Sequence, residues 1–397
     1  MIKTIDECFF LIQNGANIKQ GDTDGGFPIT RIETTANDKF NRDRMGYAGI
    51  TDISKYESYV LEDGDLLMSH INSVQYLGRT VLYVKQQGET IIHGMNLLRL
   101  KARRDVINPA YARYCFYGHP FRSQVGNITK KSVNQASFAV KDLKRIKIDI
   151  PTVSEQNEIV MILDKVQQVI DLRTYELSKL DDLIKARFVE MFGDPRNNSH
   201  YEYVSFEELV EYMGDIGSNG ANKVVTEHLD MTDEEDYALM VRFLNFTKND
   251  FTDDVKYISK EAYEFFKKSQ IFGGELIICK IGSAGQNYVM PNLNRPVSLG
   301  LNQIMVRINN KVEMPYLYQY LHTEYGEHLI SGCINGAVTK SITKTELKKI
   351  PVMLPPKAEQ MQFVSFVEQV DKSKVAIQNL LDENQILYDS LMQHYFE

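Results

Sequence analysis

One short segment combines residue types that could take part in chemistry on a nucleic-acid base. Asn108-Pro109-Ala110-Tyr111 is one residue away from the Asn-Pro-Pro-Tyr pattern that grips a flipped base while its exocyclic amino group is methylated. The segment has Ala in the second proline position, and it follows charged residues and not an apolar strand end. No Gly-x-Gly turn that could hold S-adenosylmethionine stands between a predicted strand and a predicted helix. We therefore interpret Pro109 as a first-turn helix proline and keep base methylation as an alternative hypothesis.

Other catalytic chemistries lack the residues that they need. No Gly-x-x-x-x-Gly-Lys loop is present to hold the phosphates of ATP. Glu275 and Lys280 in ELIICK suggest a nuclease metal site, but the related segment DLLMSH has no lysine. The four cysteines form no Cys-x-x-Cys pair, and the eight histidines show no metal-ligand spacing. With no signal peptide and no membrane span in the sequence, we expect a reduced, cytoplasmic protein without catalytic residues, metal or cofactor.

Charge is distributed unevenly along a chain whose net charge is −8. Residues 101–150 contain 11 Lys and Arg against 3 Asp and Glu, whereas residues 201–250 contain 3 against 12. A compact basic segment can neutralise the phosphates of a DNA duplex and release the counterions that are condensed there. A solvated basic face is the alternative, so the segment indicates DNA binding only with further support. The acidic stretch has no explanation from sequence.

The sequence contains an internal repeat with a period of about 205 residues. PTVSEQNEIV, which begins at Pro151, matches PPKAEQMQFV, which begins at Pro355. The spacing between matched residues drifts in one direction further upstream, as loop insertions would cause. The upstream anchors are GDLLMSHI (64–71) with GELIICKI (274–281), Asn96 with Asn302, Pro109 with Pro315, and Arg31 with Arg242. A repeat this long indicates that a domain and the helix that follows it are duplicated.

Two long helices are predicted, at residues 151–194 and 355–397. After Pro151 the next proline is Pro195, and apolar residues recur alternately every three and four residues. The predicted seam residues are Leu163, Val166, Ile170, Leu177, Leu180 and Ile184 in the first helix, and Val367, Val370, Ile377, Leu381, Tyr388 and Leu391 in the second. Helices of about 60 Å, at 1.5 Å per residue, cannot bury so long a stripe alone, so we expect a coiled coil. The alternative is that each helix lies on its own domain.

The two remaining segments, 1–150 and 195–354, are predicted to be mixed α/β domains, because short β-rich runs alternate with turns and helical pieces. Two loops recur in both domains, one after the strand that begins near Gly64 or Gly274 and one before each long helix. They mix hydrogen-bonding side chains with lysine, which suits the reading of DNA grooves. The predicted DNA-binding residues are Arg31, Asn72, Ser73, Gln75, Lys130, Lys131, Arg242, Lys280, Ser283, Thr339 and Lys340. Solvated loops are the alternative for any single residue.

With these elements in place, the whole chain resembles the specificity subunits of Type I restriction–modification systems. The resemblance rests on the GDLLMSHI and GELIICKIGSAG strand-loops, on the lead-ins KDLKRIKIDIPTVSEQNEIV and TELKKIPVMLPPKAEQMQFV, and on VEMFGDPRNN at the end of the first helix. The Pro-x-x-x-Glu-Gln entry into each long helix, at Pro151 and Pro355, is the most specific of these elements.

This resemblance implies two target-recognition domains separated by two long helices that form an antiparallel coiled coil, which would fix the distance between the domains. It implies that the chain reads a bipartite site in double-stranded DNA and docks two methyltransferase subunits that methylate adenine. A nuclease–translocase subunit can join them, and S-adenosylmethionine and ATP would bind to these partner subunits. The alternatives are a stand-alone or degenerate DNA amino-methyltransferase that uses Asn108, and a coiled-coil adaptor that binds only proteins.

Overall fold

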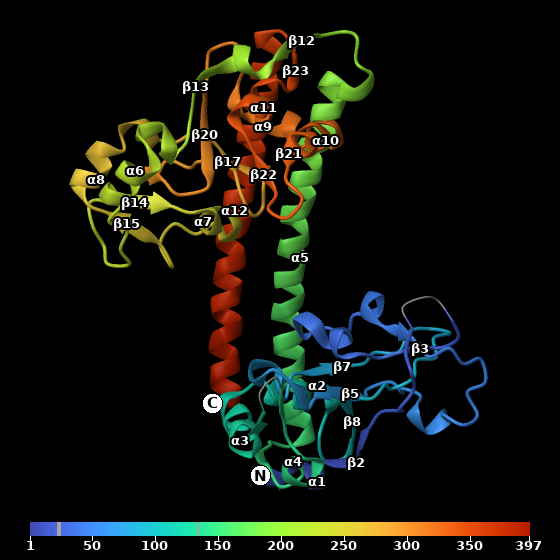
Figure 1. The fold of residues 1–397 in the computed structure, drawn as a ribbon. Coiled ribbons are helices and arrows are strands. Elements are labelled where there is room, and N and C mark those ends of the chain that lie inside the picture. Colours follow the sequence, from blue (N-terminus) through green and yellow to red (C-terminus); the bar gives the residue numbers. More distant parts are fainter. Residues whose placement is uncertain (22–24, 133–134) are drawn as a thin grey trace. The chain divides into compact units, whose positions relative to one another are not determined.

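The computed structural model describes residues 1–21, 25–132 and 135–397, and it divides the chain into two compact units. The first unit consists of residues 1–174 and 378–397, and the second unit consists of residues 175–377. Each unit contains one mixed α/β domain and a part of both long helices (Figure 1). The predicted domain boundaries at residues 150, 194 and 354 stay a prediction, because the two units divide the chain at other residues, which lie within the long helices. Among the described residues, no helix is long and apolar enough to span a membrane.

Both predicted long helices are present, as α5 (Val153–Phe192) and α12 (Lys357–Phe396), each of 40 residues. The side chain of Thr152 accepts a hydrogen bond from the backbone of Glu155, whose carboxylate accepts one from the backbone of Thr152 at 2.8 Å. Gly193 has a φ of 75°, a left-handed conformation that glycine adopts without a steric penalty, and Pro195 follows two residues later. The ends of α5 thus have the local chemistry that begins and ends a helix.

The two long helices pack against each other in an antiparallel direction within each unit. In the first unit, the beginning of α5 lies beside the end of α12, and Leu163 shares a core with Tyr388 and Leu391. In the second unit, the end of α5 lies beside the beginning of α12, and Ile184 shares a core with Val370. None of the twelve predicted seam residues is exposed. The expected antiparallel coiled coil is confirmed, and the hypothesis that each helix lies only on its own domain is wrong.

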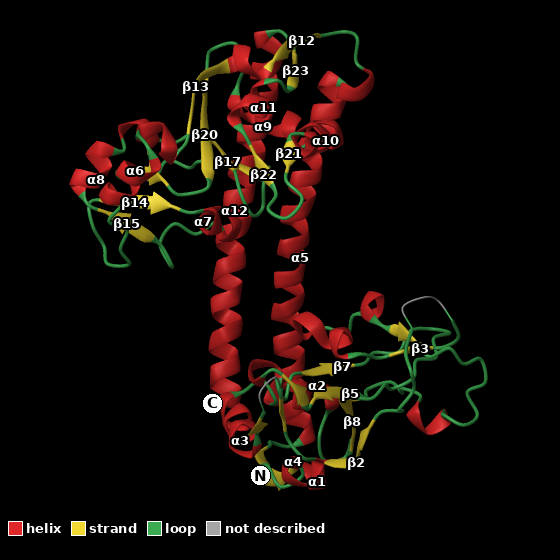
Figure 2. Ribbon diagram, in the orientation of Figure 1, coloured by secondary structure: helices red, strands yellow, loops and turns green. Residues whose placement is uncertain are grey.

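The domain of the first unit is built on an antiparallel sheet with the strand order β2-β8-β5-β7 (Figure 2). Pairing of β1 with β11 brings the two ends of the domain together. Its strands are β1 (Ile2–Thr4), β2 (Phe9–Asn14), β3 (Pro28–Ile29), β4 (Gly46–Tyr47), β5 (Leu66–Ser69), β6 (Ile71–Asn72), β7 (Thr80–Leu82), β8 (Leu97–Ala102), β9 (Lys130–Lys131), β10 (Ala136–Ser137) and β11 (Lys147–Asp149). Its helices are α1 (Ile5–Cys8), α2 (Pro109–Cys115), α3 (His119–Ile128) and α4 (Val140–Leu143).

The domain of the second unit repeats this sheet with the order β13-β20-β17-β18, and β12 pairs with β23 as β1 pairs with β11. A second sheet, β15-β14-β19-β16, contains one parallel pair, β14 with β19. The strands are β12 (Glu202–Ser205), β13 (Val210–Gly214), β14 (Ala238–Val241), β15 (Lys256–Ile258), β16 (Gln270–Ile271), β17 (Leu276–Cys279), β18 (Asn287–Val289), β19 (Val297–Leu299), β20 (Gln303–Ile308), β21 (Ile334–Asn335), β22 (Ser341–Ile342) and β23 (Pro351–Leu354). The helices are α6 (Asn222–His228), α7 (Phe243–Lys248), α8 (Lys260–Phe265), α9 (Met314–Leu321), α10 (Glu324–Gly332) and α11 (Lys344–Lys348).

Matched residues of the sequence repeat adopt the same unusual backbone conformations. Gly64 and Gly274 have φ angles of 86° and 87°, and Asn96 and Asn302 have φ angles of 80° and 60°. Positive φ angles are uncommon outside glycine, although asparagine tolerates them better than most residues. The agreement at two separate turns shows that the repeat is a structural duplication.

The glutamine of each Pro-x-x-x-Glu-Gln motif joins a long helix to its domain. Gln156 is fully buried; its side-chain oxygen accepts from Asn108 N at 2.8 Å, and its amide donates to Val106 O at 3.0 Å. Gln360, also fully buried, makes the matching hydrogen bonds to Glu313 N at 2.9 Å and Lys311 O at 3.2 Å. A buried main-chain group without a partner is costly, so each glutamine fixes the segment that leads into α2 or α9.

Candidate nucleic-acid interface

The two recurrent loops of the first unit meet in one small sheet, although they lie about sixty residues apart in the sequence. β10 pairs with β6 on one side and with β9 on the other, so that Ala136 lies opposite both Asn72 and Lys131. Lys130 and Lys131 are exposed on the outer strand. The structure thus brings together Asn72, Lys130 and Lys131, three of the predicted DNA-binding residues.

The turn after β6 projects three side chains from a backbone that is held at several points. Val74, Gln75 and Tyr76 form a 3-10 turn, η4 (Val74–Tyr76), in which Val74 and Tyr76 are 50% and 37% exposed. The guanidinium of Arg122 donates to Leu77 O at 2.5 Å and to Gln75 O at 3.2 Å. A protruding turn whose carbonyls are fixed in this way loses little conformational entropy when its side chains contact a ligand.

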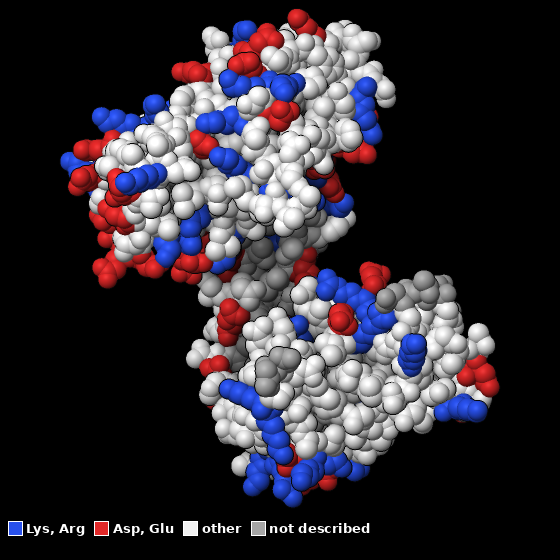
Figure 3. All heavy atoms as spheres, viewed as in Figure 1, with Lys and Arg blue, Asp and Glu red and all other residues white. Residues whose placement is uncertain are grey.

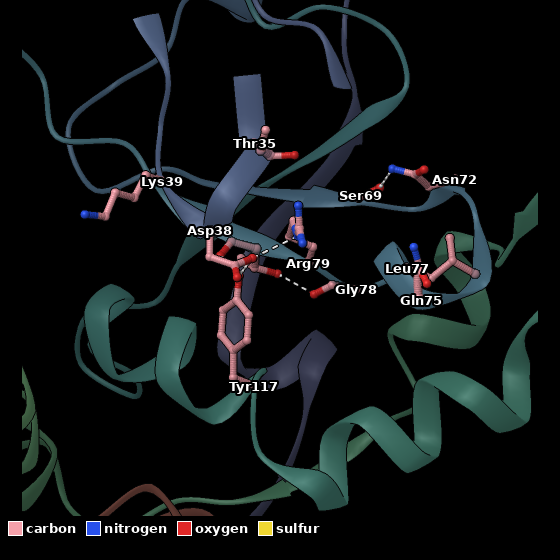
Figure 4. A network of polar contacts seen from close by, with 12 residues as sticks. Thr35, Asp38, Lys39, Ser69, Asn72, Gln75, Leu77, Gly78, Arg79 and Tyr117 are labelled. Carbon is pink, nitrogen blue, oxygen red and sulfur yellow. Dashed lines mark hydrogen bonds and ion pairs between the residues drawn. The ribbon is translucent and has the colours of Figure 1, made fainter. Parts of the chain in front are cut away.

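A network of polar contacts lies beside the same turn (Figure 4). Arg79 Nε lies 2.8 Å from Asp38 Oδ1, and the hydroxyl of Tyr117 donates to the same oxygen at 2.7 Å. The Arg79 guanidinium also lies 4.6 Å from the centre of the Tyr76 ring, which is a cation–π contact. Burial, together with the hydrogen bond to Asp38, raises the pKa of Tyr117, so this hydroxyl stays protonated. Arg79 was not among the residues predicted from the sequence, although it directly follows the turn that contains Val74 and Tyr76.

In the second unit, the two recurrent loops meet at a bridge between Ile281 and Ser341. Ile342 N donates to Lys280 O at 3.0 Å, which ties the loop after β17 to strand β22. Ser283, Thr339 and Lys340 are exposed on these loops, and Lys280 is half-buried. The same loop pair is therefore present in both units, with different side chains.

Lys280 contacts a buried carboxylate that sequence reasoning missed. Its Nζ lies 2.8 Å from Asp215 Oδ2, and Nζ of Lys344 lies 3.0 Å from Asp215 Oδ1. Burial by itself would raise the pKa of Asp215, but hydrogen bonds from Lys280, Lys344 and Ser218 outweigh it and hold this pKa at about 2. Asp215 is consequently ionised at neutral pH and shared by two ammonium groups.

Arg31 and Arg242 lie elsewhere in their units, where both hold main-chain carbonyls. Arg31 Nη2 donates to Gly21 O at 2.7 Å, and the guanidinium of Arg242 donates to Asp254 O and lies 3.0 Å from the carboxylate of Asp254. Each arginine directly precedes a helix, η1 (Ile32–Asp38) or α7. The matched positions have matched structural roles, and the contact of either arginine with DNA stays a prediction.

The basic segment 101–150 and the acidic stretch 201–250 occupy different regions of the structure. In the basic segment, Lys147 lies on β11 opposite Thr4, and Lys144 pairs with Asp6. Both lysines thus belong to the end of the first unit that carries the N-terminus, where Figure 3 shows Lys and Arg side chains. In the acidic stretch, Asp233 pairs with Lys256, near β14 and β15, where Figure 3 shows acidic side chains gathered. Of the basic segment, Lys130 and Lys131 lie on a recurrent loop, whereas Lys144 and Lys147 do not.

The Asn108-Pro109-Ala110-Tyr111 segment is a helix start and not an open base-gripping loop. Asn108 Oδ1 accepts from Ala110 N at 2.7 Å, and the Asn108 amide donates to Asn157 at 2.7 Å. Pro109 is the first residue of α2, as predicted, and Tyr111 is only 1% exposed. A flipped base would need the polar atoms of the asparagine, and these already have partners.

Two matched domains, each with the same sheet order, the same loop pair and the same glutamine-anchored long helix, define the class to which the chain belongs. The family model of the Type I restriction modification DNA specificity domain matches residues 2–182 and 198–387. The chain belongs to this family, and it is a specificity subunit of a Type I restriction–modification system, with two target-recognition domains for DNA sequence.

Individual relatives agree with this assignment. The "Putative type I restriction enzyme MjaX specificity subunit" of Methanocaldococcus jannaschii is 26% identical over 408 residues, which span 96% of this chain and 92% of the relative. The EcoKI specificity subunit of Escherichia coli K12 is 27% identical over 150 residues, 38% of this chain and 32% of the relative.

Solved structures show the same fold. The S subunit of the Type I restriction–modification system from M. genitalium has a TM-score of 0.57 at 13% identity, with 99% of this chain and 95% of that chain covered. A structure that concerns complex assembly and conformational transition of the type I R-M system has a TM-score of 0.52 at 16% identity and covers 100% and 97%.

Proposed function

We propose that each unit reads one half of a bipartite site in double-stranded DNA through its pair of recurrent loops. The observation that carries this proposal is the duplication, because both units present the same loop pair on the same sheet order. The side chains of the two loop pairs differ, so the two half-sites differ in sequence. DNA readers with two recognition surfaces commonly bind two separated half-sites.

The side chains of the loops divide into two kinds of contact. Exposed lysines, among them Lys130, Lys131 and Lys340, suit the phosphates that set the position of a protein on the duplex. Asn72, Gln75 and Ser283 carry the donors and acceptors that distinguish base edges in a groove. The held turn at 73–79 would present Gln75 to the bases together with Val74 and Tyr76.

The long helices offer a second apolar face that suits protein partners. Met161 and Leu172 are 65% and 54% exposed on the part of α5 that belongs to the first unit, and Leu183 is 46% exposed on the part that belongs to the second unit. On α12, Val375 and Ile386 are 61% and 70% exposed. Exposed apolar side chains in a row are typical of interaction surfaces. We assign these faces to two methyltransferase subunits, one for each copy of the repeat. A nuclease–translocase subunit can join the complex that they form.

In this proposal the chain itself catalyses no reaction. The partner subunits bind S-adenosylmethionine and ATP, and the complex acts in the cytoplasm, where the DNA is. This division of labour is supported by the hydrogen bonds that already engage the side chain of Asn108 and by the burial of Tyr111. Among the described residues, no three His, Cys, Asp or Glu side chains are grouped as metal ligands.

Methyl transfer from labelled S-adenosylmethionine to DNA tests the proposal directly. The purified chain alone should transfer no label, whereas the chain with its cognate methyltransferase subunit should label adenine and protect two separated segments in a footprint. Label transfer by the chain alone would support the alternative of an enzyme that uses Asn108. Binding of the partner without any protected DNA segment would instead support an adaptor that binds only proteins.

A further inference from the structure

Three charged side chains of the second unit meet where its two recurrent loops come together. Asp215 follows β13, Lys280 follows β17, and Lys344 is the first residue of α11, two residues after β22. Both lysines lie within 3.0 Å of the one carboxylate, and Lys344 also donates to Ser218 Oγ at 3.1 Å. One ammonium group thus comes from the loop after β17 and the other from the start of α11, just after β22, and both reach a single carboxylate.

The burial of these groups shows which of them faces solvent. The side chain of Asp215 is 10% exposed, whereas those of Lys280 and Lys344 are 37% and 36% exposed. One carboxylate and two ammonium groups leave a net charge of +1. An ammonium group has three donors, and Lys280 uses one of them on Asp215, so donors of the lysine pair remain available on the solvent side.

We propose that Lys280 and Lys344 together bind one backbone phosphate of the second half-site, and that Asp215 is the positioning residue that holds the two lysines for it. This inference rests on the proposed reading of DNA by the loop pairs. A free lysine side chain loses rotamer entropy when it binds, and a carboxylate that already restrains two lysines reduces this cost. Because lysine acts as a point charge, the contact sets the register of the domain and does not select a base.

The first unit lacks a lysine at both positions that the repeat matches to Lys280 and Lys344. His70 stands where the second unit has Lys280, and Val140, the first residue of α4, stands where it has Lys344. His70 is 6% exposed and lies against the ring of Phe138. The phosphate contact therefore belongs to the second half-site alone, and its loss should leave the first half-site unaffected.

Substitution of Asp215 separates positioning from simple attraction, because the two effects have opposite signs. Removal of a negative charge near a phosphate should strengthen binding if charge alone matters. If Asp215 positions the lysines, Asp215→Asn in the complex with the methyltransferase should bind its mapped DNA site about three- to tenfold more weakly. Asp233→Asn, which removes an exposed carboxylate that also pairs with a lysine, is the matched control and should not weaken binding.

The lysines provide a second test that does not depend on the fold around a buried carboxylate. The double variant Lys280→Met/Lys344→Met should reduce the slope of log Kd against log salt concentration by about 0.9, the value for one phosphate contact. Footprints should lose protection at the second half-site and keep it at the first. Unchanged affinity and slope in all of these variants, with sequence-specific binding by the wild-type complex, would overturn this inference. Absence of sequence-specific binding by the wild-type complex would instead contradict the proposed function.

Discussion

Two buried histidines of the first unit should make its stability depend on pH. His70 is 6% exposed and His93 is fully buried, and their Nδ1 atoms have no hydrogen-bond partner among the described residues. Burial lowers the pKa of His70 to about 4 and that of His93 to about 3. A histidine in an unfolded chain titrates near pH 6.5, so the unfolded state binds protons at a pH where the folded state does not.

We predict that the first unit loses stability as the pH falls from 6.5 towards 4. Each histidine should lower the free energy of unfolding by about 1.4 kcal/mol per pH unit in this window, because only the unfolded state gains the proton. Urea denaturation at several pH values, followed with a probe in the first unit, measures the slope. His70→Gln should remove about half of this dependence. His119→Gln, at an exposed position of α3, is the control, and equal slopes in both variants would contradict the prediction.

At the scale of residues, the sequence indicates the loops but not the partners that hold their side chains. The repeat draws attention to Lys280 because its strand recurs, but it does not indicate that Asp215 and Lys344 lie beside this lysine. These two residues are separated by 129 positions, and only the tertiary fold brings them together.

At the scale of elements, the glutamine that opens each long helix is a structural joint. We predict that Gln156→Leu will lower the free energy of unfolding of the first unit by about 2–4 kcal/mol, because Asn108 N and Val106 O lose their partner in a partly buried position. Hydrogen exchange on peptides from both units measures the effect, and the second unit should keep its protection.

Two further variants make this prediction specific. Gln360→Leu should reverse the pattern, with loss of protection in the second unit and not in the first. Gln168→Leu changes an exposed glutamine of the same helix and should leave both units unchanged. Equal loss of protection in both units after Gln156→Leu would contradict the assignment of this glutamine to one joint.

Long helices and sheets differ in how far the sequence predicts them. The heptad pattern and the absence of proline predict α5 and α12 to within two residues at each end, because these signals are local. The pairing of β1 with β11 and of β9 with β10 and β6 depends on contacts between distant segments. Alternation of apolar residues indicates that such strands exist, but it does not specify their neighbours.

At the scale of the whole molecule, the compact units do not follow the order of the chain. Residues 378–397 belong to the first unit, and Phe396 is 7% exposed with its ring 5.3 Å from that of Tyr111. A sequence read from one end to the other assigns the last helix to the second domain, because the repeat places it there. The role of the paired helices in fixing the distance between the domains stays a prediction.

The central claim is that each unit reads one half of a bipartite DNA site independently of the other. Residues 1–150 should be replaced by the corresponding domain of a relative with a different specificity, and methylated adenines should be mapped across host DNA with the partner subunits present. We predict that one half of the methylated sequence changes and that the other half stays as it is with the wild-type chain. A change in both halves, or a methylated sequence without a second half, would contradict the account.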